Sequence, residues 1–272
     1  MFSVLMSVYK NDNLEFFDIA LRSIYDQTFK PSQIVLVCDG ELPSCFYESI
    51  AFWSERFSAC DIEFEEVRLK YNLGLGGALR EGSRYCNQEF IIRMDSDDIS
   101  LDNRFELTCS AIKNNPEASV IGGQIEEFYS DIGDLNRKRL VPLSTADITK
   151  FGKKRNPMNH VTVCIRKGCL EGVGNYESVI FHEDYYLWVK LLSSNYKLIN
   201  IPDTLVMVRT GNDLIGRRIG LGYFNYEYNF IRKCINIGYM NKKEATKYLF
   251  PRLFFRVMPK FMLNNVYKRL RG

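Results

Sequence analysis

The sequence predicts an α/β protein with a doubly wound, mostly parallel sheet, helices on both faces of that sheet, and a helical C-terminal region. Four strand-like segments, each followed by a helix-like segment, alternate through residues 1–115. One of these strands, Ile34 to Cys38, is apolar throughout, as strands covered on both faces are. From about Gly216 onward only helical patterns remain. Ligands of such sheets bind at the carboxyl ends of the strands, so we expect the site at that edge.

Caps, breakers and apolar periodicity mark the first two units. Ser3–Val8 is a predicted strand, and Asn13 or Asp12 can cap the helix that follows it. The segment Lys30-Pro31-Ser32 ends that helix. After the apolar strand, spacings of three and four predict a second amphipathic helix through Phe46, Ile50, Trp53 and Phe57.

The later elements follow the same logic and then loosen. The third and fourth units are predicted at Ile62–Leu69 with Gly76–Tyr85, and at Phe90–Met94 with Leu101–Asn115. A further strand covers Val120–Phe128, and residues 130–155 are expected to be a charged connection. The last expected elements of this part are three short strands and one helix, at Val161–Arg166, Lys197–Ile201, Leu205–Arg209 and Asp184–Leu192.

Composition excludes several classes of protein. The chain has 272 residues, of which 46% are hydrophobic and 25% charged, as in a folded protein with one large or two small domains. We find no apolar run long enough to span a bilayer and no secretory signal, so we expect a cytosolic protein. Eight scattered cysteines, without a Cys-x-x-Cys pair and with only two histidines, favour reduced thiols over a zinc site.

Charge is unevenly distributed along the chain. Residues 232–272 hold eleven Lys or Arg against one acid, Glu244, whereas the whole chain carries +3. Arg252, Arg256 and Lys260 recur every four residues and would form one basic stripe on a helix. Such a stripe suits the surface of an anionic membrane, although the neighbouring apolar residues could equally pack on the rest of the protein. No nucleic-acid-binding motif accompanies these residues, so nucleic acid is not an expected partner.

Polar residues follow the predicted parallel strands where each strand ends. Tyr9, Asp39, Asn72 and Asp95 should therefore lie along one edge of the sheet. Asp39-Gly40 by itself is also typical of a plain turn. The turn Asn72-Leu73-Gly74-Leu75-Gly76-Gly77-Ala78 could bring backbone N–H groups to an anion, but it lacks the third glycine of a dinucleotide fingerprint. Because no phosphate loop of the G-x-x-x-x-G-K type occurs either, nicotinamide and P-loop enzymes are disfavoured.

The run Asp95-Ser96-Asp97-Asp98 carries the strongest local signal. In extended chain, residues two apart point the same way, so Asp95 and Asp97 can present two carboxylates to one place. Hard oxygen ligands beside a phosphate suit Mg²⁺ or Mn²⁺. Asp98 or Ser100 could instead cap the next helix, but that would leave the other two acids unexplained.

The second half offers fewer candidates. Glu183-Asp184 precedes an aromatic helix start, where Asp184 could be either a helix cap or a general base beside a sugar. His160 is expected to be structural rather than catalytic. Arg209, Arg217 and Arg218 could meet a diphosphate, although arginines are common on any surface.

Taken in order, these pieces resemble the family 2 nucleotide-sugar glycosyltransferases with the GT-A fold, over about residues 1–210. The resemblance rests on seven segments in the order of that family: Val4-Leu5-Met6-Ser7-Val8-Tyr9, Leu21-Arg22-Ser23-Ile24 with Gln27-Thr28, Val37-Cys38-Asp39-Gly40, Asn72-Leu73-Gly74-Leu75, Met94-Asp95-Ser96-Asp97-Asp98, Asn156-Pro157 with His160, and Glu183-Asp184 with Leu187-Trp188. It implies a catalytic domain over residues 1–215, with a nucleotide-binding half at 1–115 and an acceptor-side half at 116–215. Residues 216–272 would then form a separate basic helical region.

The resemblance also implies roles for single residues. Asp39 would accept a hydrogen bond from uracil, Asp95 would lie near the ribose, Asp97 would bind the divalent metal with Asp95, and Asp184 would be the general base. The other donor-binding residues implied are Ser7, Val8, Tyr9, Asn72, Gly76, Ser96, Arg209 and Arg217. The acceptor-side residues implied are His160, Glu183 and Trp188. One departure from the family pattern is Cys38, in place of the usual Asp before Asp39.

The activity implied is transfer of a hexose, glucose or galactose, from a UDP-sugar to a hydroxyl of a lipid-diphosphate-linked saccharide. The configuration would invert to a β-linkage, with Mn²⁺ or Mg²⁺ as cofactor, in bacterial surface polysaccharide synthesis. The enzyme would work in the cytoplasm, peripherally on the inner face of the cell membrane. A nucleotidyltransferase remains an alternative, although residues Ser7 to Asn11 lack the glycine-rich loop of that class. A glycoside hydrolase is a further alternative, although it would need no metal-binding Asp-x-Asp.

Overall fold

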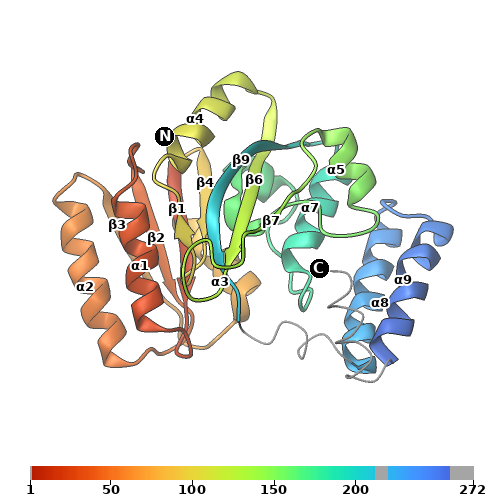
Figure 1. Ribbon diagram of the computed structural model, residues 1–272, viewed down its shortest axis with the longest axis horizontal. Coiled ribbons are helices and arrows are strands. Elements are labelled where there is room, and N and C mark those ends of the chain that lie inside the picture. The colour runs from red at the N-terminus through yellow and green to blue at the C-terminus, as the bar shows by residue number, and fades with distance from the viewer. Residues whose placement is uncertain (1, 212–219, 258–272) are drawn as a thin grey trace. The chain divides into compact units, whose positions relative to one another are not determined.

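The computed structural model describes residues 2–211 and 220–257 (Figure 1). Its chain divides into two compact units. The larger unit comprises Met1–Ser178 with Glu183–Thr210, and the smaller unit comprises Val179–His182 with Gly211–Gly272. Short Val179–His182 thus belongs to the smaller unit although larger-unit residues stand on both sides of it in the sequence.

The first part of the larger unit contains the four strands and the first three helices of the strand–helix units that the sequence predicts. In chain order they are β1 (Phe2–Val8), α1 (Leu14–Tyr25), β2 (Gln33–Cys38), α2 (Ser44–Ser58), β3 (Glu63–Arg68), α3 (Gly74–Tyr85) and β4 (Phe90–Met94). The four strands are parallel in the order β3-β2-β1-β4. Asn13 is the helix cap, since its side chain accepts a hydrogen bond from the N–H of Phe16 at 3.1 Å. The carboxyl ends of all four strands therefore meet at one edge.

The second part is less regular than predicted. Its elements are β5 (Ile99–Ser100), α4 (Arg104–Asn114), β6 (Ala118–Phe128), β7 (Arg137–Arg139), α5 (Thr145–Phe151), the 3₁₀ turn η1 (His160–Thr162), β8 (Cys164–Arg166), α6 (Lys167–Gly172), α7 (Glu183–Ser193) and β9 (Lys197–Arg209). The expected connection at 130–155 holds a short strand and a helix, and the two expected strands after Lys197 are one continuous strand. Register shifts in the β6–β9 ladder let that strand continue past Pro202.

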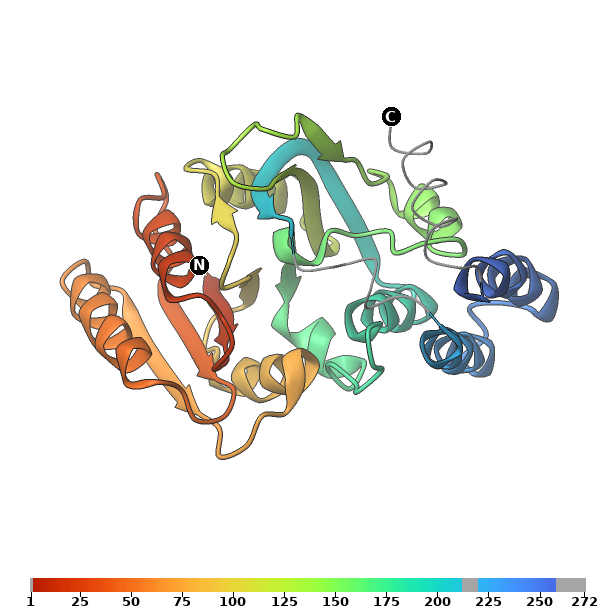
Figure 2. The same ribbon diagram turned by 60° about the horizontal axis from the view of Figure 1, so that its bottom comes forward.

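One mixed sheet unites both parts. Its order is β3-β2-β1-β4-β8-β6-β9-β5, and β7 pairs with β6 (Figures 1 and 2). Short β8 is antiparallel to both β4 and β6, so it joins the parallel β1–β4 set to the parallel β6–β9 pair. The fold class predicted from the sequence is confirmed.

Alternating side chains build one core on each face of the sheet. On β1, Val4 and Met6 pack in the core that contains residues of α1 and α2, whereas Leu5 packs in the core that contains residues of α3 and α7. This alternation follows the two-residue period of a strand. Helices therefore cover both faces, as a doubly wound sheet requires.

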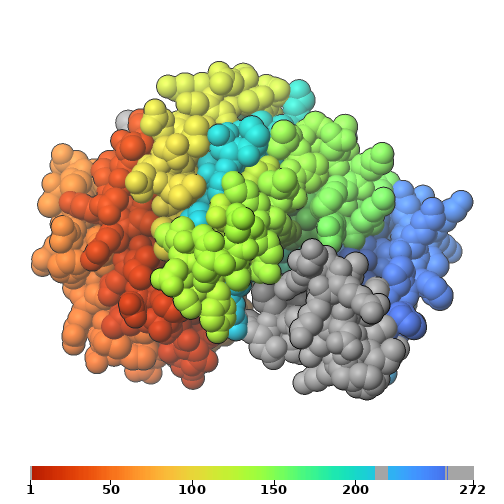
Figure 3. Space-filling model, in the orientation of Figure 1, coloured from red at the N-terminus to blue at the C-terminus, as the bar shows by residue number. Residues whose placement is uncertain are grey.

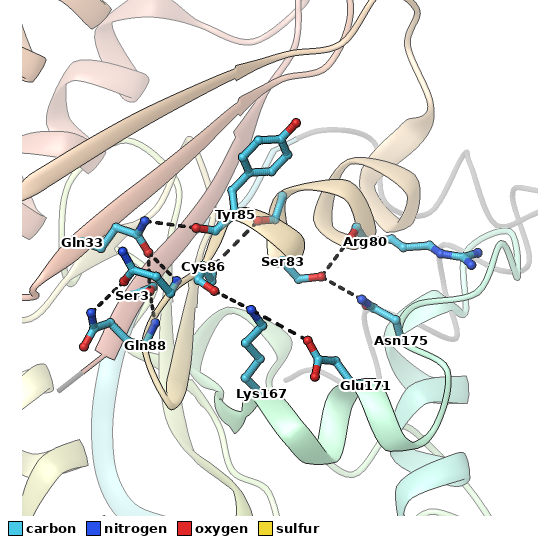
Figure 4. Close-up of polar contacts among 12 residues, drawn as sticks. Ser3, Gln33, Arg80, Ser83, Tyr85, Cys86, Gln88, Lys167, Glu171 and Asn175 are labelled. Carbon is cyan, nitrogen blue, oxygen red and sulfur yellow. Dashed lines mark hydrogen bonds and ion pairs between the residues drawn. The ribbon is translucent and has the colours of Figure 1, made fainter.

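Helix α3 is fixed at its C-terminal end by a polar network (Figure 4). The Gln33 side chain accepts from the Ser3 hydroxyl at 2.6 Å and donates to the Tyr85 carbonyl at 3.0 Å. From the other side, the Lys167 ammonium donates to the Cys86 carbonyl at 2.6 Å. Gly82 lets the helix lie close to the strands, because a Cβ there would stand 2.4 Å from a methyl group of Val37. The glycine-rich N-terminus of α3 is thereby held at the carboxyl edge of the sheet.

The smaller unit consists of α8 (Leu221–Asn236), α9 (Lys242–Val257) and the segment Val179–His182. Glu227 on α8 is 2% exposed and pairs with both Arg252 and Arg256 of α9, at 3.3 Å and 2.9 Å. Two arginines of the basic stripe thus hold α9 to α8, which favours packing over a free basic surface for these two residues, and Lys260 lies outside the described residues. None of the described helices is both long enough and apolar enough to cross a membrane.

Candidate active site

The loops after β2 and β3 meet at the carboxyl edge. Asp39 receives a hydrogen bond from the N–H of Leu73 at 2.6 Å, and the Asn72 amide donates to the Asp39 carbonyl at 3.2 Å. Gly40 has φ +88°, and a Cβ there would stand 3.0 Å from the Asn72 nitrogen, so the turn needs glycine. Burial raises the pKa of Asp39, while the bonded N–H groups of Leu73 and Gly74 oppose that rise. The structure thus brings Asp39 and Asn72 together, because hydrogen bonds join the loop after β2 to the loop after β3.

The end of β1 contributes less side chain than predicted. Val8 is 1% exposed and belongs to the core, so only its backbone is available to a ligand. The neighbouring Tyr9 ring is 39% exposed, and Ser7 is partly buried. The Tyr9 N–H donates to the Asp12 carboxylate at 3.1 Å, which closes the loop into α1.

Four carboxylates gather where this loop meets the end of β4. Asp12 accepts from the Ser96 hydroxyl at 2.8 Å, and so joins the run that contains Asp95 and Asp97. Burial, with the charges of Asp95 and Asp12, raises the pKa of Asp97 to about 6. The sequence pattern indicates only a helix cap at Asp12, so this contact was not predicted. Its position in the loop after the first strand was the available signal.

Asp98 is not a helix cap, because α4 begins at Arg104 and its N-cap residue is Asn103. The Asp98 side chain instead accepts from the N–H of Arg209 at 2.9 Å, and burial raises its pKa well above the ordinary value. The Arg209 guanidinium lies 3.7 Å from the centre of the Phe16 ring and donates to the Asp97 carbonyl at 3.3 Å. Arg209 is therefore at the site, whereas Arg217 and Arg218 lie outside the described residues.

A buried arginine below the acids was missed. Arg93, on β4, is 3% exposed and forms an ion pair with Asp95. Within the described chain its Nε and Nη1 atoms have no hydrogen-bond partner. Burial and then the charge of Arg93 lower the pKa of His160, and the same charge opposes the rise that burial causes in the pKa of Glu183. Arg93 precedes Asp95 by two residues in an extended strand, which was the available signal.

The donor set fits a hard divalent cation. Asp95 and Asp97 offer carboxylate oxygens. Burial, together with the charges of neighbouring acids, raises the pKa of Asp97 and Asp98, so a cation would relieve the repulsion. Although four carboxylates lie near one another, no three or more of the described His, Cys, Asp or Glu side chains are placed so that they could hold one ion together. A cation held here would therefore complete its shell with water and substrate phosphate oxygens, as Mg²⁺ usually does.

Facing this cluster, α7 begins with two acids. Asp184 lies in the first turn of α7, and its Oδ2 accepts from the Asn156 amide at 2.6 Å. Glu183 packs over α3, where a Cβ on Gly76 would stand 3.1 Å from the Glu183 Cβ. Burial, and then the charge of Asp184, raises the pKa of Glu183 to about 7. Gly76 therefore lets the starts of α3 and α7 approach each other. The contact of Asn156 with Asp184 was not predicted from the sequence.

The aromatic residues near the start of α7, His160, Tyr176 and Trp188, pack against one another and have a structural role. His160 Nε2 and the Tyr176 hydroxyl lie 2.9 Å apart and share a hydrogen bond. Burial and Arg93 hold the pKa of His160 well below its usual range, so the ring is neutral at pH 7. Trp188 is 0% exposed and packs edge-on to His160 with ring centres 5.8 Å apart. The acceptor-side prediction is corrected for Trp188, because a fully buried ring cannot touch an acceptor.

Acidic side chains at the carboxyl edge of a doubly wound sheet, with a further pair of acids at the start of a helix, are typical of one class of enzyme, the glycosyltransferases that use activated sugars. Residues 3–171 match the model of Glycosyl transferase family 2. The chain belongs to this family.

Relatives and solved structures agree with that assignment. The chain is 34% identical over 269 residues to the amylovoran biosynthesis glycosyltransferase AmsE of Erwinia amylovora, covering 99% of this chain and 98% of the relative. It is 32% identical to the UDP-Gal:alpha-D-GlcNAc-diphosphoundecaprenol beta-1,3-galactosyltransferase of Escherichia coli, covering 99% and 96%.

Two solved structures share the fold at low identity. The structure of S. aureus TarS 1-349 in complex with UDP-GlcNAc superposes with a TM-score of 0.66 at 15% identity, covering 92% of this chain and 71% of that one. The mannosyltransferase PcManGT from Pyrobaculum calidifontis, in complex with GDP-Man and Mn²⁺, gives 0.63 at 15% identity, covering 93% and 68%. The protein is thus a GT-A glycosyltransferase.

Proposed function

We propose that the enzyme transfers a hexose, glucose or galactose, from a UDP-sugar to a hydroxyl of a lipid-diphosphate-linked saccharide, in bacterial surface polysaccharide synthesis. The observation that carries this proposal is that two acidic elements surround the buried Arg93 and Tyr176. Arg93 pairs with Asp95 at the end of β4, and the charges of Glu183 and Asp184 at the start of α7 reach Tyr176 together with those of Arg93 and Asp95. A relative of nearly equal length is named for a galactosyl transfer to a diphosphoundecaprenol-linked sugar, which supports the acceptor class. Work on such an acceptor would place the enzyme at the inner face of the cell membrane.

Each element has a role in this proposal. The turn with Asp39 and Asn72, the Tyr9 loop and Ser96 hold the nucleotide, and Arg209 faces the diphosphate. Asp97, with Asp95, would hold Mn²⁺ or Mg²⁺, which supplies positive charge to the leaving diphosphate. Arg93 keeps Asp95 in place from below.

Asp184 takes the proton of the acceptor hydroxyl. The Asn156 amide holds its Oδ2, and we assign the proton to Oδ1. The acceptor oxygen bonds to the anomeric carbon while the bond from that carbon to the UDP oxygen breaks, and UDP leaves with the electron pair. Attack from the face opposite UDP inverts the configuration and gives a β-linkage. Glu183 and neutral His160 line the acceptor side.

A panel of UDP-sugars tests the proposal. UDP release is measured with each donor, with Mn²⁺, Mg²⁺ or EDTA, and with or without a lipid-diphosphate-linked N-acetylhexosamine. We expect one UDP-hexose to be consumed rapidly only with acceptor and metal. Release of pyrophosphate from UTP and a sugar phosphate would instead indicate a nucleotidyltransferase, and hydrolysis of a glycoside without any nucleotide would indicate a hydrolase.

A further inference from the structure

Arg209 ends β9 and contacts two aromatic rings on other elements. Its guanidinium carbon lies 3.7 Å from the centre of the Phe16 ring on α1 and 4.6 Å from the centre of the Phe128 ring, which ends β6. Phe128 is 1% exposed and stands opposite Arg209 in the β6–β9 ladder. In Figure 3 the red atoms of the first helix lie beside the yellow-green atoms near the end of β6. Since a guanidinium is attracted to the faces of aromatic rings, the two rings restrain its position.

Arg209 also holds the acidic loop, which comprises residues 95–98 between β4 and β5. Its Nε donates to the Asp97 carbonyl at 3.3 Å, and its backbone N–H donates to the Asp98 carboxyl at 2.9 Å. Directly after this loop, Ile99 of β5 pairs with Met207 of β9. Within the described residues, Arg209 makes no ion pair with an acid of the loop. Its contacts therefore restrain the shape of the loop rather than pair with its charges.

The shape of the acidic loop matters because its carboxylates repel one another. The charges of Asp95 and Asp12 both act on Asp97, which the proposed function makes a ligand of the cation. Mg²⁺ requires near-ideal octahedral geometry, and a binding group must be held within about 0.5 Å of its productive position. Residues 95–98 belong to no helix or strand. Bonds from outside the loop must therefore hold it against this repulsion.

We propose that Arg209 is a positioning residue, which fixes the Asp97 peptide so that the Asp97 carboxylate can hold the cation. Phe16 and Phe128 serve the same end, because they restrain the Arg209 guanidinium. This inference rests on the proposed function, in which Asp97 holds that cation. It adds to the contact of Arg209 with the donor's diphosphate, which needs the positive charge alone. Lysine would supply that charge, but it has no planar fork to lie over the two rings.

Hydrogen exchange of the ligand-free enzyme, followed by mass spectrometry over residues 95–100, tests the restraint on the loop. The variant F16L keeps an apolar side chain but removes the ring next to the guanidinium. We expect exchange in this stretch to become about 2- to 30-fold faster, the range that corresponds to the loss of one cation–π contact. R209K should have a similar effect although it keeps the charge, whereas F16Y, which keeps the ring, should exchange as the wild type does. Thermal unfolding checks that each variant remains folded.

Mn²⁺ binding provides a second measurement. The enzyme is titrated with Mn²⁺ in the absence of nucleotide, and free Mn²⁺ is measured by electron paramagnetic resonance. Binding should be weaker by about 2- to 30-fold in F16L and R209K, because the restraint on Asp97 is lost.

The matched control, F52L, removes a ring from the same kind of contact on α2. There the Arg56 guanidinium lies 5.2 Å from the centre of the Phe52 ring, and Phe52 is 50% exposed. F52L should leave both the exchange of residues 95–100 and the Mn²⁺ affinity unchanged. Unchanged exchange or unchanged Mn²⁺ affinity in F16L and R209K would overturn the positioning role, and so would equal changes in F52L.

Neither measurement uses a donor or an acceptor. A wild-type enzyme that transfers no hexose from any UDP-sugar would therefore overturn the proposed function, whereas failure of the two loop measurements would overturn this inference alone.

Discussion

The β1–β4 side of the candidate site and the α7 side differ in how they hold their acids. On the β1–β4 side, four carboxylates lie together, and burial and mutual repulsion raise the pKa of Asp12, Asp97 and Asp98. On the α7 side, Asp184 is oriented by one amide, beside a neutral His160–Tyr176 pair. The first arrangement suits binding of positive charge, and the second suits a base that must point in one direction. Loss of charge and loss of direction should therefore have different consequences on the two sides.

The largest effect is expected from Asp184→Asn. This variant keeps shape but cannot take the acceptor proton, so kcat should fall on the order of 10² to 10⁴-fold. UDP binding, measured by calorimetry, should change little because the β1–β4 side is untouched. A folded Asp184→Asn protein with wild-type turnover would show that Asp184 is not the base.

Asp97→Asn should act on the other side of the comparison. Removing one charged oxygen ligand should cost on the order of 10² in kcat/KM and weaken the activation by Mn²⁺. Activity is measured across a Mn²⁺ titration and with EDTA. If the variant responds to metal and chelator as the wild type does, Asp97 holds no cation.

The β1–β4 side was the more predictable of the two. A parallel sheet brings consecutive strand ends to one edge, so Asp39 and Asp95 could be placed from the order of elements alone. Two residues on this side were not predicted. Asp12 lies in a loop, where the sequence indicates a helix cap, and Arg93 lies inside a strand, where the sequence indicates a structural residue. Polar residues at strand ends can be placed from the order of the elements. The role of a buried charged residue can be inferred only from the residues that it contacts.

The arrangement of the residues on the α7 side depends on long-range contacts that local sequence patterns do not predict. The bond from Asn156 to Asp184 joins an irregular loop to a helix 28 residues later. Trp188 was misplaced because an aromatic residue near a helix start suits either a sugar platform or a core, and only the packing beneath His160 decides between them. In the smaller unit, Arg252 and Arg256 of the basic stripe likewise pair with buried Glu227, a contact that the spacing of the arginines does not predict.

Glu183→Gln should change how stability depends on pH. Because folding raises the pKa of Glu183 from 4.5 to about 7, the folded state binds this proton more tightly than the unfolded state does. Wild-type stability should therefore fall as pH rises from about 5 to 7, by at most about 3 kcal/mol from this group. The variant should lose that part of the fall, which urea unfolding at pH 5 and pH 8 measures. Glu55→Gln, on the exposed face of α2, is the control, and a pH 5 to pH 8 difference equal in E183Q and wild type would contradict the assignment.

The smallest effect, and the sharpest separation of the two sides, is expected from Asn156→Ala. Asp184 would keep its charge but lose the 2.6 Å bond that sets its direction. We expect kcat to fall about 10-fold, because misorientation of a catalytic group raises the barrier without removing the base. KM for the UDP-sugar should stay within about twofold, since the nucleotide is held on the β1–β4 side. Asn87→Ala is the matched control, because Asn87 makes the same kind of bond to Glu63, at 2.7 Å, before β4 at the amino ends of the parallel strands. Equal losses of kcat in both variants would mean that Asn156 supports the fold rather than the direction of the base.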